Sequence, residues 1–225
     1  MKPEAETLVR SGTDWAPVPF VPEVTLRTAA EPFALWDRTE RDAPPFWAFP
    51  WAGGQGLARY VLDHPATVAG RRVLDVASGS GLVAIAAAKA GAQSVLAGDI
   101  DENALAAIAL NAAANAAPAV IAGRLDLADG FTRGPGPDGD GALAAAGAVP
   151  DVVLAADVCY QRDLAALALG FLQAARQAGA DVLIADPGRA FVPRASLTEL
   201  HSYQVPVLTV LEDTPVKPVT IYRLR

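Results

Sequence analysis

The chain has 225 residues, 52% of them hydrophobic, which suits one α/β domain with a sizeable core. The formal net charge of −7 argues against a nucleic-acid partner, because phosphate binding favours a basic surface. One cysteine excludes a disulfide framework, and two histidines leave little for zinc, so we expect no metal. The N-terminus resembles neither a signal peptide nor a transit segment, and no membrane span is indicated, so we expect a cytoplasmic protein.

Proline is frequent at the start of the chain. We expect a short helix followed by an irregular arm over residues 1–22, and short strands over residues 24–27 and 33–37 that flank a turn. A short helix is expected over residues 56–62, which ends near a His-Pro pair. These elements precede the main α/β alternation, so we assign them to an N-terminal extension and its junction with the core.

An aromatic segment, PFWAFPWAGGQ over residues 45–55, is unusual for a linker. Four aromatic side chains fall between Phe46 and Trp51 and are followed by two glycines. One interpretation is a hydrophobic arm packed on the core. The other is a wall of a ligand pocket, in which Trp51 presents a flat face to a ring or a cation. The residues alone leave both open.

The stretch over residues 71–91 is typical of a strand, a glycine turn and a helix. The apolar run over residues 73–76 predicts a buried strand, although Asp75 lies inside it, where an unpaired carboxylate is costly. Gly79 and Gly81 can adopt backbone angles closed to other residues and allow a ligand close to the main chain. The helix that follows presents free N–H groups and a positive dipole end, which can hold a carboxylate or a phosphate.

A second strand, over residues 93–97, leads to Asp99, 20 positions after Gly79. This spacing places a carboxylate beside the glycine turn, where it can accept hydrogen bonds from a ribose diol. Asp101 is expected to cap the next helix, which ends before Pro118. These features extend the candidate site from one strand end to two.

The rest of the chain continues the alternation of strands and helices. Asp126 follows a third strand and either faces an adenine amino group or is an exposed turn acid. Asp157 and Tyr160 follow the fourth strand in the segment DVCY, on the same edge as Gly79. The expected elements are strands over 119–122, 151–156 and 182–185, a loop over 128–150, helices over 164–178 and 193–200, and a closing strand pair over 201–211 and 216–224, with its prolines at bends or an edge.

This alternation predicts an α/β fold with a mostly parallel sheet and helices on both faces. Ligands of such sheets bind beyond the carboxyl ends of the strands, where Asp75, Asp99, Asp126 and Asp157 would gather. A nicotinamide dinucleotide carries a pyrophosphate, which this group of carboxylates would repel. S-adenosylmethionine carries a sulfonium and an ammonium against one carboxylate, and suits an acidic crevice better. The turn itself, Gly79-x-Gly81-x-x-Ala84, also matches the dinucleotide fingerprint and does not decide between them.

Several motifs resemble one known family. The segment VLDVASGSG over residues 73–81 resembles the first motif of class I S-adenosylmethionine-dependent methyltransferases, and the DVCY segment over 157–160 resembles the D/E-x-x-Y motif of seven-strand lysine methyltransferases. The aromatic segment over 45–55 and the DPGR segment over 186–189 are similar to lysine methyltransferases of the electron transfer flavoprotein β subunit. The resemblance covers about residues 45–189.

The resemblance implies a Rossmann-like, doubly wound, mostly parallel seven-stranded sheet with an antiparallel C-terminal strand. Residues 1–45 would form an N-terminal extension packed on the core, and residues 46–225 the methyltransferase domain. The implied cofactor is S-adenosylmethionine, with S-adenosylhomocysteine as its product and no metal. The implied partner is a protein with an accessible lysine, the flavoprotein β subunit, with no nucleic acid and no membrane.

The implied cofactor-binding residues surround the methionine, ribose and adenine parts: Trp51, Asp75, Ser78, Gly79, Gly81, Asp99, Ile100 and Asp126. Among them, Asp75 would organise the methionine end, Asp99 would hold the ribose, Asp126 would approach the adenine and Trp51 would close over the cofactor. One departure is Ala77, which stands where many relatives carry glycine; alanine fits there if its φ is negative.

The implied catalytic residues are Asp157 and Tyr160, which would position the acceptor lysine. Three other functions stay open: a small-molecule N-methyltransferase acting on a nicotinamide-like amine, a NAD-dependent oxidoreductase, and a non-catalytic cofactor-binding module. The oxidoreductase is disfavoured because neither His64 nor His201 is a convincing hydride-transfer acid. Retention of Asp157 and Tyr160 beside the glycine turn argues against the non-catalytic module.

Overall fold

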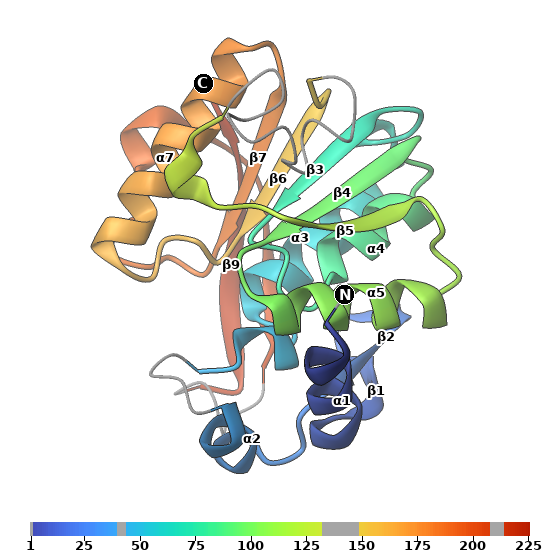
Figure 1. The fold of residues 1–225 in the computed structure, drawn as a ribbon. Helices are drawn as coiled ribbons and strands as arrows, with labels where there is room; N and C mark the ends of the chain where they lie inside the picture. The colour runs from blue at the N-terminus through green and yellow to red at the C-terminus, as the bar shows by residue number, and fades with distance from the viewer. Residues whose placement is uncertain (1, 40–43, 132–148, 208–213) are drawn as a thin grey trace.

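The computed structural model describes residues 2–39, 44–131, 149–207 and 214–225. A sheet of seven strands forms its centre, in the order β5-β4-β3-β6-β7-β9-β8. The strands are β3 (Arg72–Val76), β4 (Ser94–Asp99), β5 (Val120–Arg124), β6 (Val152–Ala156), β7 (Asp181–Asp186), β8 (Leu197–Pro206) and β9 (Val216–Leu224). Strands β3 to β7 pair in parallel, and β9 runs antiparallel to both of its neighbours. The predicted Rossmann-like sheet with an antiparallel C-terminal strand is confirmed (Figure 1).

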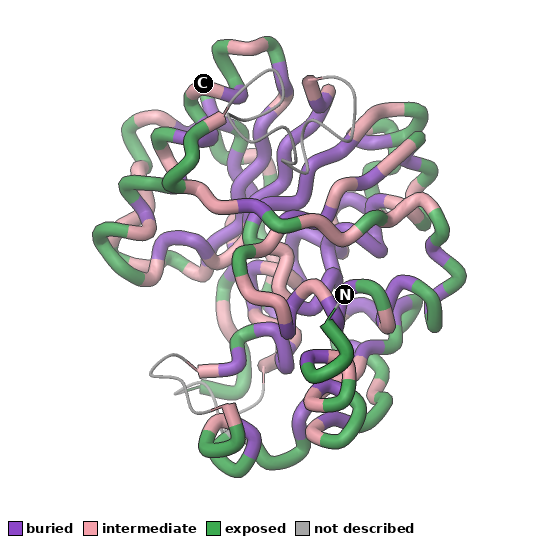
Figure 2. Tube along the Cα trace, viewed as in Figure 1, coloured by how far each residue is buried: buried purple, intermediate pink, exposed green. Residues whose placement is uncertain are grey.

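Helices cover both faces of the sheet. One face carries α3 (Ala52–Asp63), α4 (Leu82–Lys89) and α5 (Glu102–Ala114), and the other carries α7 (Arg162–Gln177). Successive side chains of each central strand alternate between the two apolar clusters: Val73 packs with the first group of helices and Leu74 with α7. The central strands β3, β6 and β7 are therefore covered on both faces, and Figure 2 shows most of their residues as buried. This explains why they appear in the sequence as continuous apolar runs.

The N-terminal segment is more regular than its sequence suggests. It contains the predicted helix, α1 (Pro3–Gly12), followed by an antiparallel hairpin of β1 (Asp14–Val18) and β2 (Val21–Thr28) instead of an irregular arm. The prediction of a strand over 33–37 was wrong, because this segment belongs to a helix, α2 (Pro32–Thr39). Proline suits a first helical position. The two-residue spacing of Phe33 and Leu35 would put both on one face of a strand, whereas in the helix Phe33 is exposed and Leu35 is buried.

Asparagine side chains attach the hairpin to the domain. The Arg27 N–H donates to Asn111 Oδ1 at 2.9 Å, and the Thr25 N–H donates to Asn115 Oδ1 at 3.0 Å. Both asparagines lie at the C-terminal end of α5. They satisfy backbone groups on an edge of β2 that would otherwise lack a partner strand, so the hairpin is fixed on the helical layer.

The C-terminal hairpin corrects a second prediction. A helix was expected over 193–200, but only one 3-10 turn (Arg194–Ser196) forms, since the chain from Leu197 onward pairs with β9. The strand pair itself is confirmed over the described residues, with Pro206 ending β8. Pro218 lies in β9 beyond the pairing with β7, which begins at Thr220, so its missing N–H costs no hydrogen bond there.

Smaller differences lie at element ends. The expected helix over 56–62 begins earlier, at Ala52, and so includes both glycines of the aromatic segment. The loop expected over 128–150 starts with a 3-10 turn (Leu127–Asp129), and most of it lies outside the described residues. Among the helices of the described residues, none has the length and apolar character needed to cross a bilayer.

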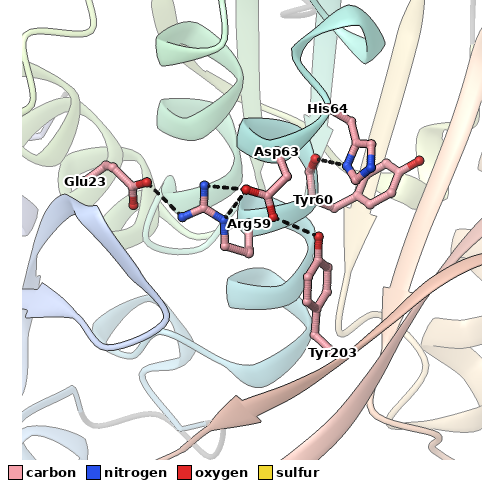
Figure 3. A network of polar contacts seen from close by, with 6 residues as sticks. All are labelled: Glu23, Arg59, Tyr60, Asp63, His64 and Tyr203. Atoms are coloured by element: carbon pink, nitrogen blue, oxygen red, sulfur yellow. Dashed lines mark hydrogen bonds and ion pairs between the residues drawn. The ribbon is translucent and has the colours of Figure 1, made fainter.

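A polar network holds the C-terminal end of α3 (Figure 3). Arg59 lies 2.8 Å from both Glu23 of β2 and Asp63 of its own helix. The hydroxyl of Tyr203, on β8, donates to the other oxygen of Asp63 at 3.1 Å. One end of α3 is thus tied to the N-terminal hairpin and to an edge of the main sheet.

Candidate active site

A cavity of about 410 Å³ opens at the carboxyl ends of β3, β4 and β6. This size lies within the range of about 300–1,000 Å³ that small-molecule sites occupy. Eight of the ten predicted site residues line it: Trp51, Asp75, Ser78, Gly79, Asp99, Ile100, Asp157 and Tyr160. The structure therefore brings the predicted cofactor and acceptor residues together at one edge of the sheet, as expected of parallel strands.

The glycine turn has the backbone geometry that its sequence predicts. Gly79 has φ +56° and Gly81 has φ +83°, both in the left-handed region. A side chain at Gly81 would also place its Cβ 3.4 Å from the Cα of Ile108, so this glycine lets α4 approach α5 closely. Ala77 does not meet the condition for an easy fit, because its φ is +52°. A left-handed alanine costs about 1–2 kcal/mol, so the turn carries strain at Ala77.

Asp75 is buried beneath the turn and holds it from inside. The Ser78 hydroxyl donates to Asp75 Oδ2 at 2.5 Å, and the Ala84 N–H donates to the same oxygen at 3.1 Å. Burial raises the pKa of the Asp75 carboxyl to about 7, although both hydrogen bonds favour the ionised form. A cation placed nearby would favour the carboxylate, so this residue is suited to the ammonium end of an amino acid.

Asp99 joins the second strand to the same turn. Its Oδ2 accepts from the Gly79 N–H at 2.8 Å, and its Oδ1 accepts from the Asp101 N–H at 3.0 Å. Burial raises the pKa of Asp99, and these backbone N–H groups oppose the rise. Asp101 caps α5 as predicted, accepting from the Asn103 N–H. Asp99 is thus fixed with its carboxylate lining the cavity, where hydroxyl donors of a ribose can be bound.

Asn111 is a supporting residue that sequence reasoning missed. It is completely buried, and its Nδ2 donates to the Ser80 carbonyl at 2.8 Å while its Oδ1 binds the hairpin. The side chain therefore links α5, the glycine turn and the N-terminal hairpin. The available signal was an asparagine within an alanine-rich helix, a position where an unpartnered amide would be costly to bury.

The aromatic segment serves both roles that were left open. Trp47 and Phe49 are buried in a cluster with α1 and α5, as a packed arm requires. Trp51 lines the cavity, and its indole N–H donates to the Phe46 carbonyl at 2.8 Å. The same short segment thus packs on the core and forms a wall of the pocket.

The corner that is predicted to hold the acceptor, here called the acceptor corner, lies where β6 ends. Asp157 has φ +57°, and its Oδ2 accepts from the Gly54 N–H, in the first turn of α3, at 2.8 Å. A Cβ on Gly53 would lie 2.6 Å from that carboxylate oxygen, so only glycine permits this approach. Gly53 leaves the space for Asp157, and the Gly54 N–H binds its carboxylate at a helix N-terminus, where a carboxylate is stabilised.

Tyr160 and Arg189 complete this corner. The rings of Tyr160 and Phe46 lie 5.3 Å apart, and burial raises the pKa of the Tyr160 hydroxyl. Arg189 Nη2 lies 3.4 Å from Asp157 Oδ1, and the guanidinium lies 5.8 Å from the Tyr160 ring centroid. Arg189 belongs to a segment singled out in the sequence, but no role could be assigned to it there.

Two predicted residues do not line the cavity. Gly81 lies behind the turn at the start of α4, where it shapes the loop. Asp126 accepts from the Ala128 N–H at 3.0 Å and lies 3.6 Å from Arg124, so it caps a turn, and its approach to an adenine stays a prediction. Within the described residues, no group of three or more acidic, histidine or cysteine side chains is arranged to hold a metal ion.

The lining fits S-adenosylmethionine better than a dinucleotide. Four aspartates line the cavity against a single cation, Arg189, among its described lining residues. This charge favours a sulfonium and an ammonium and opposes a pyrophosphate. Asp75 and the glycine turn would hold the methionine end, and Asp99 the ribose. The seven-stranded sheet, the strained glycine turn and the acidic crevice define a class I S-adenosylmethionine-dependent methyltransferase.

Comparison with known proteins narrows this class. The chain is 35% identical over 205 residues to the electron transfer flavoprotein beta subunit lysine methyltransferase of Mus musculus, covering 86% of this chain and 73% of the relative. For the Homo sapiens protein of the same name, identity is 34% over 202 residues, with 87% and 70% covered. The chain therefore belongs to the family of electron transfer flavoprotein beta subunit lysine methyltransferases.

Other comparisons agree with the fold and the class. The sequence profile of the family described as ribosomal protein L11 methyltransferase (PrmA) matches residues 60–132. The solved structure of magnesium protoporphyrin IX methyltransferase from Synechocystis PCC 6803, with bound S-adenosylhomocysteine, superposes with a TM-score of 0.53 at 13% identity. The match covers 86% of this chain and 94% of that one, and at this identity it speaks for the fold alone.

Proposed function

We propose that the protein transfers methyl groups from S-adenosylmethionine to lysine side chains of the electron transfer flavoprotein β subunit. The observation that carries the proposal is the corner formed by Asp157 and Tyr160, which shares one cavity with the glycine turn. The substrate is the one printed in the names of the mouse and human relatives. The proposed acceptor is therefore a protein, not a free amine.

The mechanism requires an uncharged amine. When bound, S-adenosylmethionine supplies a methyl group on a sulfonium; the lysine nitrogen displaces the sulfur, leaving S-adenosylhomocysteine and a charged methyl-lysine. Asp157 and Tyr160 orient the lysine, and this positioning accounts for most of the catalysis. Asp157 is not a strong base, since a carboxylate favours the protonated amine, so the lysine proton leaves through water. Tyr160 lines the same corner as Asp157, and a methylated lysine that loses its proton to water there can accept a further methyl group.

The site itself points to two groups of roles. Asp75, Ser78, Gly79 and Asp99 form a connected hydrogen-bonded unit around the turn, and we assign them to the cofactor. Asp157 accepts from the Gly54 N–H of α3, at a different strand end, and we assign it to the acceptor. Trp51 and Ile100 also line the cavity, which supports their assignment to the cofactor.

Incubation with methyl-labelled S-adenosylmethionine tests the proposal. A purified flavoprotein β subunit and an extract of the host are each offered as acceptors, and labelled products are identified by mass spectrometry. We expect label on lysines of the β subunit. Label that appears only on small molecules would overturn the proposal in favour of a nicotinamide-like amine. A cytoplasmic location stays part of the proposal, to be checked by fractionation of host cells.

A further inference from the structure

A second feature of the acceptor corner bears on the charge of the lysine. Asp157 alone would bind the acceptor as an ammonium ion, which cannot attack a methyl group. Yet the Asp157 carboxylate already interacts with the protein through both oxygens: Oδ2 with the Gly54 N–H at 2.8 Å and Oδ1 with Arg189 Nη2 at 3.4 Å. Its charge is therefore largely compensated before any substrate arrives.

The turn that carries Arg189 is itself firmly held. Asp186, completely buried at the end of β7, accepts from the Gly188 N–H at 2.7 Å and from the Arg189 N–H at 2.6 Å. Gly188 has φ +92°, which the tight turn requires. Asp157 is joined to the same strand end, because its N–H donates to the Ala185 carbonyl at 3.1 Å. The carboxylate and the guanidinium are thus delivered to each other by adjacent strands of the sheet.

We propose, on the basis of the proposed lysine methyltransferase function, that Arg189 is a positioning residue that sets the charge of the acceptor corner. By pairing with Asp157 it prevents the carboxylate from holding the incoming lysine as an ammonium ion. Its own positive charge, 5.8 Å from the Tyr160 ring, also disfavours a second cation there. The corner therefore admits the acceptor as a neutral amine while Asp157 still orients it.

Other ionisable groups surround the Asp157–Arg189 pair, and their pKa values decide at which pH the titration of the lysine can be measured. Cys159 and Tyr160 follow Asp157, Asp186 and Arg194 lie behind Arg189, and Asp75, Asp99 and Asp101 face them across the cavity. Burial raises the pKa of Cys159 to about 12 and raises that of Tyr160. The pKa of Asp75 is about 7. Measurements between pH 8 and 10 therefore report mainly on the lysine.

The pH profile of kcat, which reflects the enzyme–substrate complex, gives the first test. For Arg189→Gln with the flavoprotein β subunit as acceptor, we expect a loss of about tenfold at pH 8, because an uncompensated carboxylate raises the lysine pKa by about one unit. In the wild-type complex we expect the corner to lower the pKa of the bound lysine to about 9, from about 10.4 for free lysine. The loss should therefore shrink to within about twofold at pH 10, where deprotonation no longer limits the rate. Arg189→Lys should restore the wild-type profile. Arg162→Gln, at an arginine on α7 that packs over Phe191, is the matched control and should leave it unchanged.

Proton release gives a second test that does not depend on turnover. The β subunit is titrated calorimetrically into the enzyme with S-adenosylhomocysteine at pH 9, in buffers of different ionisation enthalpy. We expect the wild-type protein to release a proton on binding and Arg189→Gln to release less. An equal loss of kcat at every pH, or no proton release by the wild-type protein, would overturn the role of Arg189. Failure of the wild-type protein to bind or methylate the β subunit would instead overturn the proposed function.

Discussion

The two sides of the cavity use carboxylates in opposite ways. On the cofactor side, the described contacts of Asp75 and Asp99 are with hydroxyl and backbone N–H donors, and no guanidinium or ammonium accompanies them. On the acceptor side, Asp157 is paired with the Arg189 guanidinium and with the start of α3. The first side presents carboxyl groups whose ionised form a cationic ligand would favour, whereas the second is close to neutral and suits an uncharged amine.

Because the two sides of the cavity differ, we expect substitutions to affect donor binding and methyl transfer separately. A change on the cofactor side should act first on the affinity for the donor. A change on the acceptor side should act first on the rate at saturating donor, with the donor still bound. If substitutions on both sides changed donor affinity and rate together, the cavity would have to be regarded as one undivided site.

The largest effect is expected at Asp157. We predict that Asp157→Asn lowers kcat at least about 100-fold, because misplacing the reacting groups by a small distance costs this much. Asparagine is preferred to alanine here because it tolerates the left-handed φ of +57°. Calorimetry should find the affinity for S-adenosylhomocysteine unchanged within about twofold of the wild type. A parallel loss of that affinity would move Asp157 to the cofactor side.

The reverse pattern is expected at Asp99. Asp99→Ala should weaken S-adenosylhomocysteine binding by about 10- to 100-fold, since hydrogen bonds to charged groups contribute about 1.5–3 kcal/mol. At saturating donor, kcat should change little. Asp129→Ala, in the exposed turn after β5, serves as the control and should affect neither quantity. A fall in kcat without a loss of affinity would contradict the assignment.

A smaller effect is expected from substituting Gly53, which leaves space for the Asp157 carboxylate. Gly53→Ala would place a methyl group 2.6 Å from the carboxylate, so we expect kcat to fall several-fold and the free energy of unfolding to fall by about 1–3 kcal/mol. Gly170→Ala is the matched control, since a Cβ there meets nothing within 4 Å. In the middle of α7 it should raise stability by up to about 1 kcal/mol. Similar effects of the two substitutions would show that the contact with Asp157 is unimportant.

The smallest effect concerns the dependence of stability on pH. The pKa of Asp75 is raised from 3.8 to about 7 in the folded protein, so the folded state retains a proton that the unfolded state has lost. Stability must therefore fall as the pH rises through this interval. Between pH 6.5 and 8 the contribution amounts to about 1 kcal/mol. Urea unfolding should find this fall in the wild-type protein and a smaller one in Asp75→Asn; identical pH dependence would contradict the raised pKa.

The sequence was most informative where local rules decide the structure. The expected strand ends and the glycine turn were enough to predict that Asp75, Gly79 and Asp99 lie in one site, because parallel strands bring their carboxyl ends to the same edge of the sheet. It was least informative where distant segments meet. The Asp157–Arg189 pair, the seat of Asp157 on Gly54 and the link through Asn111 join residues separated by 32, 103 and 31 positions.

The errors share this cause. The strand predicted over 33–37 is a helix, because Phe33 and Leu35 fall at strand spacing in a window too short to reveal the helical period. The helix expected over 193–200 does not form because the chain from Leu197 onward pairs with β9. Local propensity cannot predict this pairing, since it depends on a segment distant in the sequence. At Ala77 the pattern identified the position but not its backbone angle, since the angle is imposed by the turn around it.

The polar network at the C-terminal end of α3 has a practical consequence for the preparation of shortened versions of the protein. Glu23 belongs to the N-terminal hairpin, yet it braces Arg59 on the helix whose opposite end seats Asp157 (Figure 3). A version shortened to residues 46–225 would remove that brace and also uncover Asn111, which supports the glycine turn. The N-terminal hairpin therefore supports the elements that form the cavity and should be kept in any fragment prepared for assay.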